Sequence, residues 1–317
     1  MDAPALADLG AFVQQHPGLL VITGAGCSTD SGIPAYRDIE GAWMRPPPMT
    51  FQQFMSGEPA RQRYWARSMV GWRYFSAGRP NAAHTALKSL EDKGYIGLLV
   101  TQNVDGFHHQ AGQSRLVELH GSLAQIVCMN CGCRFDRIDY QHRLQAENPE
   151  WVKLTAVMGP DGDVDLESDF STFRVPPCTR CGGILKPDVV FFGEPVPRER
   201  VQTVYHALDQ ANAVLVVGSS LMVYSGFRFV RDAAAQGKPI VAITRGRTRA
   251  DALLALKLDT ACAPVLTALD DGLPRQFPEL PEREREPESE SELQGRSTSY
   301  KALQPTEKAG QWSQKMQ

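Results

Sequence analysis

Five short apolar runs constrain the fold of this 317-residue chain more than any other feature of its sequence. Each run is rich in leucine or β-branched residues. Segments of helical length separate the runs, which is the pattern of parallel strands joined by crossover helices. The runs lie at residues 19–23, 95–101, 116–119, 214–217 and 240–243. We therefore predict an α/β fold with a Rossmann-type parallel sheet.

A small or polar cluster follows each run, and these clusters form the candidate ligand site. Ligands of open α/β sheets bind at the carboxyl ends of the strands, so we expect the five clusters to converge on one crevice. The first cluster suits the close approach of a pyrophosphate to backbone N–H groups, although a tight strand-to-helix turn gives the same letters. The clusters are Gly24-Ala25-Gly26, Thr101-Gln102-Asn103, His120-Gly121-Ser122, Gly218-Ser219-Ser220 and Thr244-Arg245-Gly246.

Two copies of the pattern C-x-x-C-G indicate a zinc site with the ligands Cys128, Cys131, Cys178 and Cys181. Two such pairs close a tetrahedral site and leave no position for water, so we predict a structural rather than a catalytic zinc. The glycine after the second cysteine of each pair favours Cys131 over Cys133 as the ligand. The alternatives are four buried free thiols or a redox pair. Metal spacing and an odd count of seven cysteines favour a reducing compartment over a disulfide framework.

Charge and hydropathy argue against two classes of partner. A net charge of -3 gives no electrostatic reason to expect nucleic acid or an anionic membrane. The apolar runs are far shorter than the roughly 20 residues that span a bilayer. The N-terminal segment carries acidic residues where a targeting sequence would carry Lys or Arg. We expect a cytoplasmic protein of bacterial type, or a mitochondrial matrix protein if it is eukaryotic. Its oligomeric state is not indicated.

The motifs and their order resemble the sirtuin family of NAD-dependent protein deacylases, over residues 17–269. The matching strings are GAGCSTDSGIPAYR (24–37), TQNVD (101–105), ELHG (118–121), the two cysteine pairs, KPDVVFFGE (186–194) and GSS (218–220). Within the family, RQRYWAR at 61–67, PDGDV at 160–164 and the long insertion are most similar to the class II branch. The resemblance implies that the chain cleaves nicotinamide from NAD, its co-substrate, and transfers the acyl group of an acyl-lysine protein or peptide to ADP-ribose.

The resemblance also implies the roles of individual residues. His120 would be the general base, and Asn103 a catalytic residue that forms the nicotinamide pocket with Asp105. A base of pKa near 7 is needed to deprotonate a ribose hydroxyl, and histidine suits that range. The resemblance assigns cofactor contacts to Gly24, Ala25, Gly26, Ser28, Tyr36, Arg37, Gln102, Asn103, Val104, Asp105, Gly218, Ser219, Ser220, Thr244, Arg245, Gly246 and Cys262.

Two further groups of residues are assigned to the acyl-lysine substrate. Val189, Phe191, Gly193 and Glu194 would form an edge that pairs with the substrate backbone by β-augmentation, although plain strand and turn would give the same letters. Tyr64 and Arg67 resemble a Tyr-x-x-Arg pair that reads carboxylated acyl groups, and an arginine fork suits a carboxylate. An inert helix face has the same spacing, and the preferred acyl group stays open.

The resemblance divides the chain into domains. Residues 1–122 and 187–275 would form the Rossmann-type NAD-binding domain, with a cofactor loop and helical module at 39–85. Residues 123–186 would be a smaller zinc-binding insertion. The Glu-rich residues 276–317 are predicted to be a disordered tail, or less favourably a charged helix that docks on a partner.

Two positions depart from the family pattern, and two other functions stay open. Thr244 stands where Asn is usual, which affects binding of the adenosine ribose, and Tyr36 stands where Phe is common. Protein mono-ADP-ribosyl transfer would use the same cleavage of nicotinamide. A non-catalytic NAD-sensing zinc module is the third reading, and the motif around His120 argues against it.

Overall fold

The structure is a computed structural model that describes residues 3–155, 157–159 and 162–276. Its main element is a six-stranded sheet in the order β11-β10-β9-β1-β2-β3, with all neighbours parallel. The strands are β1 (Leu19–Thr23), β2 (Ile96–Thr101), β3 (Leu116–Glu118), β9 (Val214–Val217), β10 (Ile240–Ile243) and β11 (Leu256–Leu258). The predicted α/β fold is confirmed, and three of the five predicted strands match to the residue. The edge strand β11 was not predicted.

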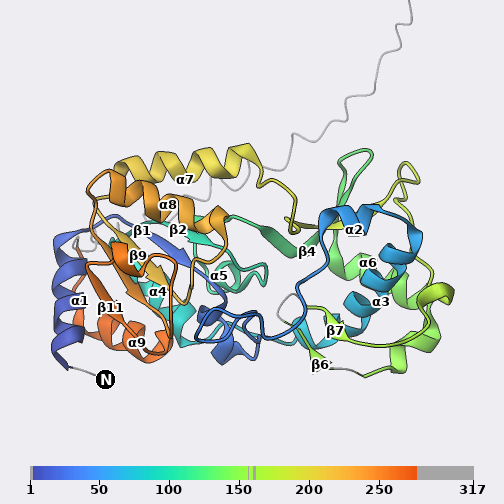
Figure 1. Ribbon diagram of the computed structural model, residues 1–317, viewed down its shortest axis with the longest axis horizontal. Coiled ribbons are helices and arrows are strands. Elements are labelled where there is room, and N and C mark those ends of the chain that lie inside the picture. Colours follow the sequence, from blue (N-terminus) through green and yellow to red (C-terminus); the bar gives the residue numbers. More distant parts are fainter. Residues whose placement is uncertain (1–2, 156, 160–161, 277–317) are drawn as a thin grey trace, which may run out of the picture. The chain divides into compact units, whose positions relative to one another are not determined.

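Helices cover both faces of this sheet, because the strand side chains alternate between two buried layers. Val21, Leu99 and Leu215 pack on one face against α1 (Ala3–Gln15), α4 (Ala82–Asp92) and α9 (Cys262–Gly272). Leu20 and Val216 pack on the other face against α7 (Arg198–Gln210) and α8 (Tyr224–Ala235). Figure 1 shows these two groups of helices on opposite sides of the strands. The central strands β1, β9 and β10 are therefore buried along their whole length and appear in the sequence as continuous apolar runs.

A second group of elements, here called the small unit, contains two antiparallel sheets and three helices. One sheet has the order β5-β4-β8 and the other pairs β6 with β7. The elements are α2 (Phe51–Met55), α3 (Glu58–Phe75), β4 (Gly121–Cys128), β5 (Arg134–Asp136), α6 (Arg137–Glu147), β6 (Val157–Met158), β7 (Val164–Asp165) and β8 (Leu185–Val189). The chain thus enters the small unit twice, between β1 and β2 and again between β3 and β9.

One aromatic core joins the helices of the small unit to its cysteine-bearing strands. Trp65 of α3 is fully buried beside Tyr140 of α6, at 4.7 Å between ring centroids. Its indole N–H donates to the carbonyl of Leu185 at 3.2 Å. Cys128 and Cys178 belong to the same apolar cluster. The predicted helical module therefore packs with the insertion. The domain boundaries themselves stay a prediction, and the predicted tail lies outside the described residues from 277 onward.

The remaining described α-helix is α5 (Phe107–Gln110), which follows β2. No helix among the described residues is long and apolar enough to cross a membrane.

Candidate active site

A cavity of about 1450 Å³ opens at the carboxyl ends of the strands. All five predicted clusters contribute to its wall, through the turn after β1 and the residues that follow β2, β3, β9 and β10. The predicted convergence on one crevice is confirmed. The sequence-predicted residues that line it are Gly24, Ala25, Gly26, Tyr36, Tyr64, Arg67, Arg37, Gln102, Asn103, Val104, His120, Val189, Phe191, Gly193, Glu194, Gly218, Ser219, Ser220, Thr244, Arg245 and Cys262.

Three predicted cofactor residues do not line this cavity. Ser28 is fully buried, and Asp105 lies behind the wall in contact with it. Gly246 belongs instead to a smaller neighbouring hollow with Arg245 and Lys257. Ser28 and Asp105 can therefore influence the cavity only by orienting residues that line it, such as Asn103.

The first turn needs glycine because it touches the turn after β9. A Cβ atom on Gly24 would lie 2.8 Å from the Cβ of Ser219, and one on Gly26 would lie 2.9 Å from the carbonyl oxygen of Gly218. The N–H of Gly26 donates to that same carbonyl at 2.8 Å. These glycines thus bring two strand-end turns together and leave open backbone beside the cavity.

A buried hydroxyl joins the two predicted residues of the nicotinamide pocket. The Ser28 hydroxyl donates to a carboxylate oxygen of Asp105 at 2.7 Å and accepts from the side-chain amide of Asn103 at 3.0 Å. The other oxygen of Asp105 accepts from the N–H of Phe107 at 2.9 Å. Burial raises the pKa of Asp105 above its ordinary value, and these hydrogen bonds partly offset the rise. The amide of Asn103 also donates to the Gly24 carbonyl, which leaves its Oδ1 as the acceptor for a ligand.

His120 follows β3 directly and is held on both sides of its ring. Its Nδ1 lies 2.8 Å from the carbonyl oxygen of Gln102, so Nδ1 carries the proton and donates it. Its Nε2 lies 2.7 Å from the hydroxyl of Ser225. Burial lowers the pKa of His120, the Gln102 carbonyl raises it, and the charges of Arg200 and Arg228 lower it further. The imidazole is therefore neutral at pH 7, as a general base must be.

Ser225 is the functional-site residue that the sequence analysis missed. It lies in the first turn of α8, 105 residues from His120 in the chain. Serine is common in first turns, so no local pattern marks this one. Only the path of the chain after the Gly218 turn brings it to the base.

The predicted pair Tyr64 and Arg67 lies on α3, but its two members have different surroundings. Tyr64 is buried against Phe54 and Phe191, each at 5.3 Å between ring centroids. The Arg67 guanidinium binds a carboxylate oxygen of Asp163 at 2.9 Å and is 3.6 Å from Asp165 on β7. Arg67, the residue predicted to bind a carboxylated acyl group, is thus already paired with two carboxylates of the chain itself.

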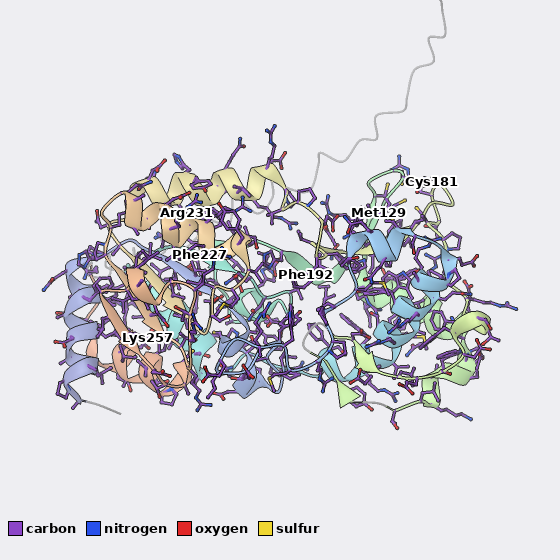
Figure 2. All side chains as sticks on the ribbon, viewed as in Figure 1. Met129, Cys181, Phe192, Phe227, Arg231 and Lys257 are labelled. Atoms are coloured by element: carbon purple, nitrogen blue, oxygen red, sulfur yellow. The ribbon has the colours of Figure 1, made fainter. Side chains whose placement is uncertain are left out.

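The predicted substrate edge continues from β8. Val189 pairs with Gly121 in the small unit, and the N–H of Val190 donates to the carbonyl of His120 at 2.8 Å. The Glu194 carboxylate accepts from the buried Lys186 ammonium at 3.1 Å and from the N–H of Phe191 at 3.0 Å. Glu194 therefore holds the shape of this segment. Phe192, labelled in Figure 2, is exposed. Its ring lies 5.7 Å from that of Trp43, measured between centroids.

The four predicted zinc ligands meet in the small unit. Their sulfur atoms all lie within 4.8 Å of one another, with Cys128 to Cys181 at 3.5 Å and Cys131 to Cys178 at 3.9 Å. Met129 and Cys181 mark the two loops in Figure 2. Cys133 contacts the Arg180 guanidinium instead, which supports the choice of Cys131. Four thiolates at this spacing fit a tetrahedral zinc.

A second group of possible ligand atoms lies under the first turn and was not predicted. Cys27, His84 and His108 are all buried with ligand atoms within 4.8 Å of one another. Burial lowers the pKa of His84 to about 4 and raises that of Cys27, so all three are neutral at pH 7. The Nε2 of His108 contacts the Thr23 hydroxyl at 3.0 Å.

Fold and site together define an α/β protein of the dinucleotide-binding type that carries a four-cysteine zinc site. The model of the Sir2 family matches residues 24–225. This range includes the glycine turn after β1, His120 and both cysteine pairs. This chain belongs to the Sir2 family, and the predicted resemblance to sirtuins is confirmed.

Individual relatives agree with this assignment. An NAD-dependent protein deacetylase of Bordetella bronchiseptica is 60% identical over 262 residues, which are 82% of this chain and 96% of that protein. NAD-dependent protein deacetylase 2 of Bradyrhizobium diazoefficiens is 56% identical over 270 residues, or 84% and 99% of the two chains. A solved Sir2 structure with a p53 peptide and NAD+ has a TM-score of 0.66 at 26% identity, over 86% of this chain and 98% of the other.

Proposed function

We propose that this chain is an NAD-dependent protein-lysine deacetylase that transfers the lysine acyl group to ADP-ribose. The observation that carries the proposal is a neutral histidine on the wall of the strand-end cavity, next to an amide pocket built by Asn103 and Asp105. The matches span nearly the whole length of the relatives named as NAD-dependent protein deacetylases, which supports the same activity for this chain.

The cavity fits NAD on the chemistry of its walls. Gly24 and Gly26 present backbone to the cavity, because a Cβ on either would collide with the Gly218–Ser219 turn. Ser219 receives a hydrogen bond from Gln102 at 2.7 Å, which orients two polar groups on the same wall. When bound, NAD would supply a leaving group, nicotinamide, and a ribose that accepts the acyl group. Asn103 would hold the nicotinamide carboxamide through its free Oδ1, and His120 would take the proton of a ribose hydroxyl.

Substitution of the base tests this proposal directly. We expect His120→Ala to lower the release of deacetylated peptide by at least about 100-fold, because general-base catalysis contributes that much. His109→Ala is the matched control, since His109 is an exposed histidine on α5. Release of nicotinamide and of deacetylated peptide would be followed by mass spectrometry, with circular dichroism to check folding. Comparable deacetylation by the His120→Ala variant and the wild type would refute the proposal.

The same assay separates the two other functions that the sequence leaves open. Label from NAD that stays on protein, rather than on a released acyl-ADP-ribose, would support mono-ADP-ribosyl transfer. Failure of the wild type to release nicotinamide with any acyl peptide would support a non-catalytic NAD-sensing module.

We also infer that the enzyme prefers uncharged acyl groups such as acetyl. Arg67 is the cation best placed to read a carboxylated chain, and Asp163 and Asp165 already neutralise it. A third carboxylate at this position would meet two others, at an electrostatic cost. The pairing joins RQRYWAR to PDGDV, the two strings that favour the class II branch, and we assign the chain to that branch.

For the protein substrate, we propose that an extended acyl-lysine segment docks along the edge after β8. Val189, Phe191 and Gly193 line the cavity next to the base. A solved Sir2 structure holds a p53 peptide together with NAD+, which supports peptide recognition by this fold. We place the protein in the cytoplasm, since four thiolates keep zinc only where they stay reduced.

A further inference from the structure

We propose that Ser225 is a second catalytic residue, which relays the proton from the ribose hydroxyl to His120. The inference rests on the proposed deacetylase function. Its starting point is the geometry of the base in the structure.

The neutral imidazole of His120 has only one lone pair to offer. Nδ1 is committed as a donor, because its partner at 2.8 Å is the carbonyl oxygen of Gln102, which only accepts. The lone pair therefore lies on Nε2. The Ser225 hydroxyl occupies it at 2.7 Å, the distance of a strong O–H···N hydrogen bond. Any proton that reaches the base must either pass through this hydroxyl or displace it.

Both partners are held by the fold. His120 is anchored through its ring by Gln102 and through its carbonyl by the N–H of Val190 at 2.8 Å. Ser225 sits in the first turn of α8, and its own carbonyl accepts from the Arg228 guanidinium at 3.1 Å. The turn before α8 contains Leu221 at φ 55°, the one non-glycine residue with positive φ among those described. A strained backbone at such a turn fixes the direction in which the helix starts.

Ser225 also faces the substrate space, because it lines the cavity together with His120 and Asn103. A serine hydroxyl can accept one proton while it donates another. In the relay, the bond between the ribose oxygen and its proton breaks and that proton joins Oγ of Ser225. The original Ser225 proton moves to Nε2, which leaves a neutral serine and an imidazolium. No oxidant or further reactant is needed.

The charged groups around the base are consistent with this order of events. Arg200 of α7 and Arg228 of α8 face His120, and both disfavour its protonated form. The Asp105 carboxylate accepts a hydrogen bond from Ser28. The resting site therefore keeps the base unprotonated until a hydroxyl enters the cavity.

The experiment compares Ser225→Ala with Ser225→Thr, which keeps the hydroxyl. We expect Ser225→Ala to lower kcat for deacetylation by about 100-fold, the scale of a lost general-base step, and Ser225→Thr to recover most of it. Exchange of labelled nicotinamide into NAD does not need the base, so it should change less than about fivefold in either variant. Solvent-isotope mixtures should show two protons in flight in the wild type.

A second readout does not depend on turnover. With 15N-labelled histidine in the ligand-free protein, we expect the Nε2 resonance of His120 to shift in Ser225→Ala while Nδ1 stays protonated. An unchanged kcat, or an unchanged Nε2 resonance, would overturn the relay. A wild type without any deacetylase activity would instead refute the proposed function, so the two failures are distinguishable.

Discussion

At the scale of single residues, the Ser28 hydroxyl is the centre of a buried hydrogen-bond network behind the cavity. It is fully buried, contacts Asp105 and Asn103, and lies 3.4 Å from the Nε2 of His84. A buried polar group that loses a partner costs about 1–3 kcal/mol, so the network is sensitive to small chemical changes. The proposed nicotinamide pocket would thus depend on Ser28 and Asp105, which lie one layer behind Asn103 on the cavity wall.

Replacement of Asp105 by Asn tests this network. The side chain keeps its size, but its NH2 group would face either the Ser28 hydroxyl or the N–H of Phe107, both of which donate to Asp105. We expect a loss of stability of about 1–3 kcal/mol in urea unfolding and at least tenfold weaker inhibition by nicotinamide. Asp139→Asn, on the exposed face of α6, is the control. Wild-type values for both quantities would show that Asp105 has no such role.

The pH dependence of the reaction follows from His120. Its pKa lies below the ordinary 6.5, chiefly because burial disfavours the charged form. The base is active when neutral, so kcat/KM should be level above pH 6.5 and fall only as the pH drops through that lowered pKa. A profile from pH 5 to pH 9 checks this. An acid limb centred above 6.5 would mean that another group controls the rate.

At the scale of elements, the β6–β7 pair sets the charge around the acyl end of the cavity. Asp163 and β7 bring two carboxylates to Arg67, and Arg45 lies 3.6 Å from Asp165. The proposed acyl selectivity would thus depend on contacts between α3 and a segment about 100 residues later.

Removal of one charge from this segment should change the acyl preference. In Asp163→Asn the nearer partner of Arg67 is neutral and only Asp165, at 3.6 Å, still pairs with the guanidinium, so Arg67 becomes more available to a carboxylated acyl chain. We expect kcat/KM for glutaryl-lysine relative to acetyl-lysine peptide to rise at least tenfold, measured with a matched peptide pair. Asp139→Asn again serves as the control. A fall in that ratio would place the carboxylate-reading cation elsewhere.

Glu91 ties α4 to the turn before β3 and makes that connection sensitive to acid. Its carboxylate accepts from the N–H groups of Ser114 and Arg115 and from the Gln113 amide at 2.6 Å. Burial raises its pKa, but these bonds and Lys88 outweigh burial and lower it to about 2. The stabilisation is therefore complete above pH 4.5 and is lost as the pH falls toward 2.

The matching variant is Glu91→Gln. We expect it to unfold at pH 7 with about 2–3 kcal/mol less free energy than the wild type, as measured in urea. The difference should shrink between pH 4.5 and pH 2. A difference that is constant over this range would show that charge on Glu91 is not its cause.

The elements that were predictable share one property, which is that their signals are local. An apolar run of four or five residues, a glycine turn or a C-x-x-C pair is read within a few positions, so β1, β9, β10 and the zinc ligands were found. β11 was missed because its three residues include Lys257 and resemble a loop. The contact of Ser225 with His120 and the pairing of Arg67 with Asp163 each join segments about 100 residues apart, so no local pattern predicts them.

At the scale of the whole molecule, zinc and catalysis are linked through a shared core. Cys128 and Cys178 pack in the same cluster as Trp65 and Tyr64 of α3, and α3 also lines the cavity. Loss of the metal should therefore loosen a wall of the active site, although the zinc touches none of the reacting groups.

Cysteine substitution tests this link with a close control. We expect Cys131→Ser to bind less than half an equivalent of zinc and to lose deacetylase activity together with near-UV circular dichroism. Cys133→Ser should keep one zinc and full activity, because Cys133 lies outside the sulfur cluster. Loss of activity in Cys131→Ser with unchanged near-UV signals would show that zinc acts on the chemistry directly.

The hydrogen bond between Val190 and the His120 carbonyl has a consequence for the choice of targets. It puts the proposed docking edge next to His120, so we expect a substrate to align by its main chain in an extended conformation. Only a stretch that can be drawn out straight will fit. An acylated lysine within a packed helix should react only after that helix unfolds locally. Across a proteome, the rate of deacetylation should therefore correlate with how readily each target unfolds locally around the lysine, and less with a consensus sequence.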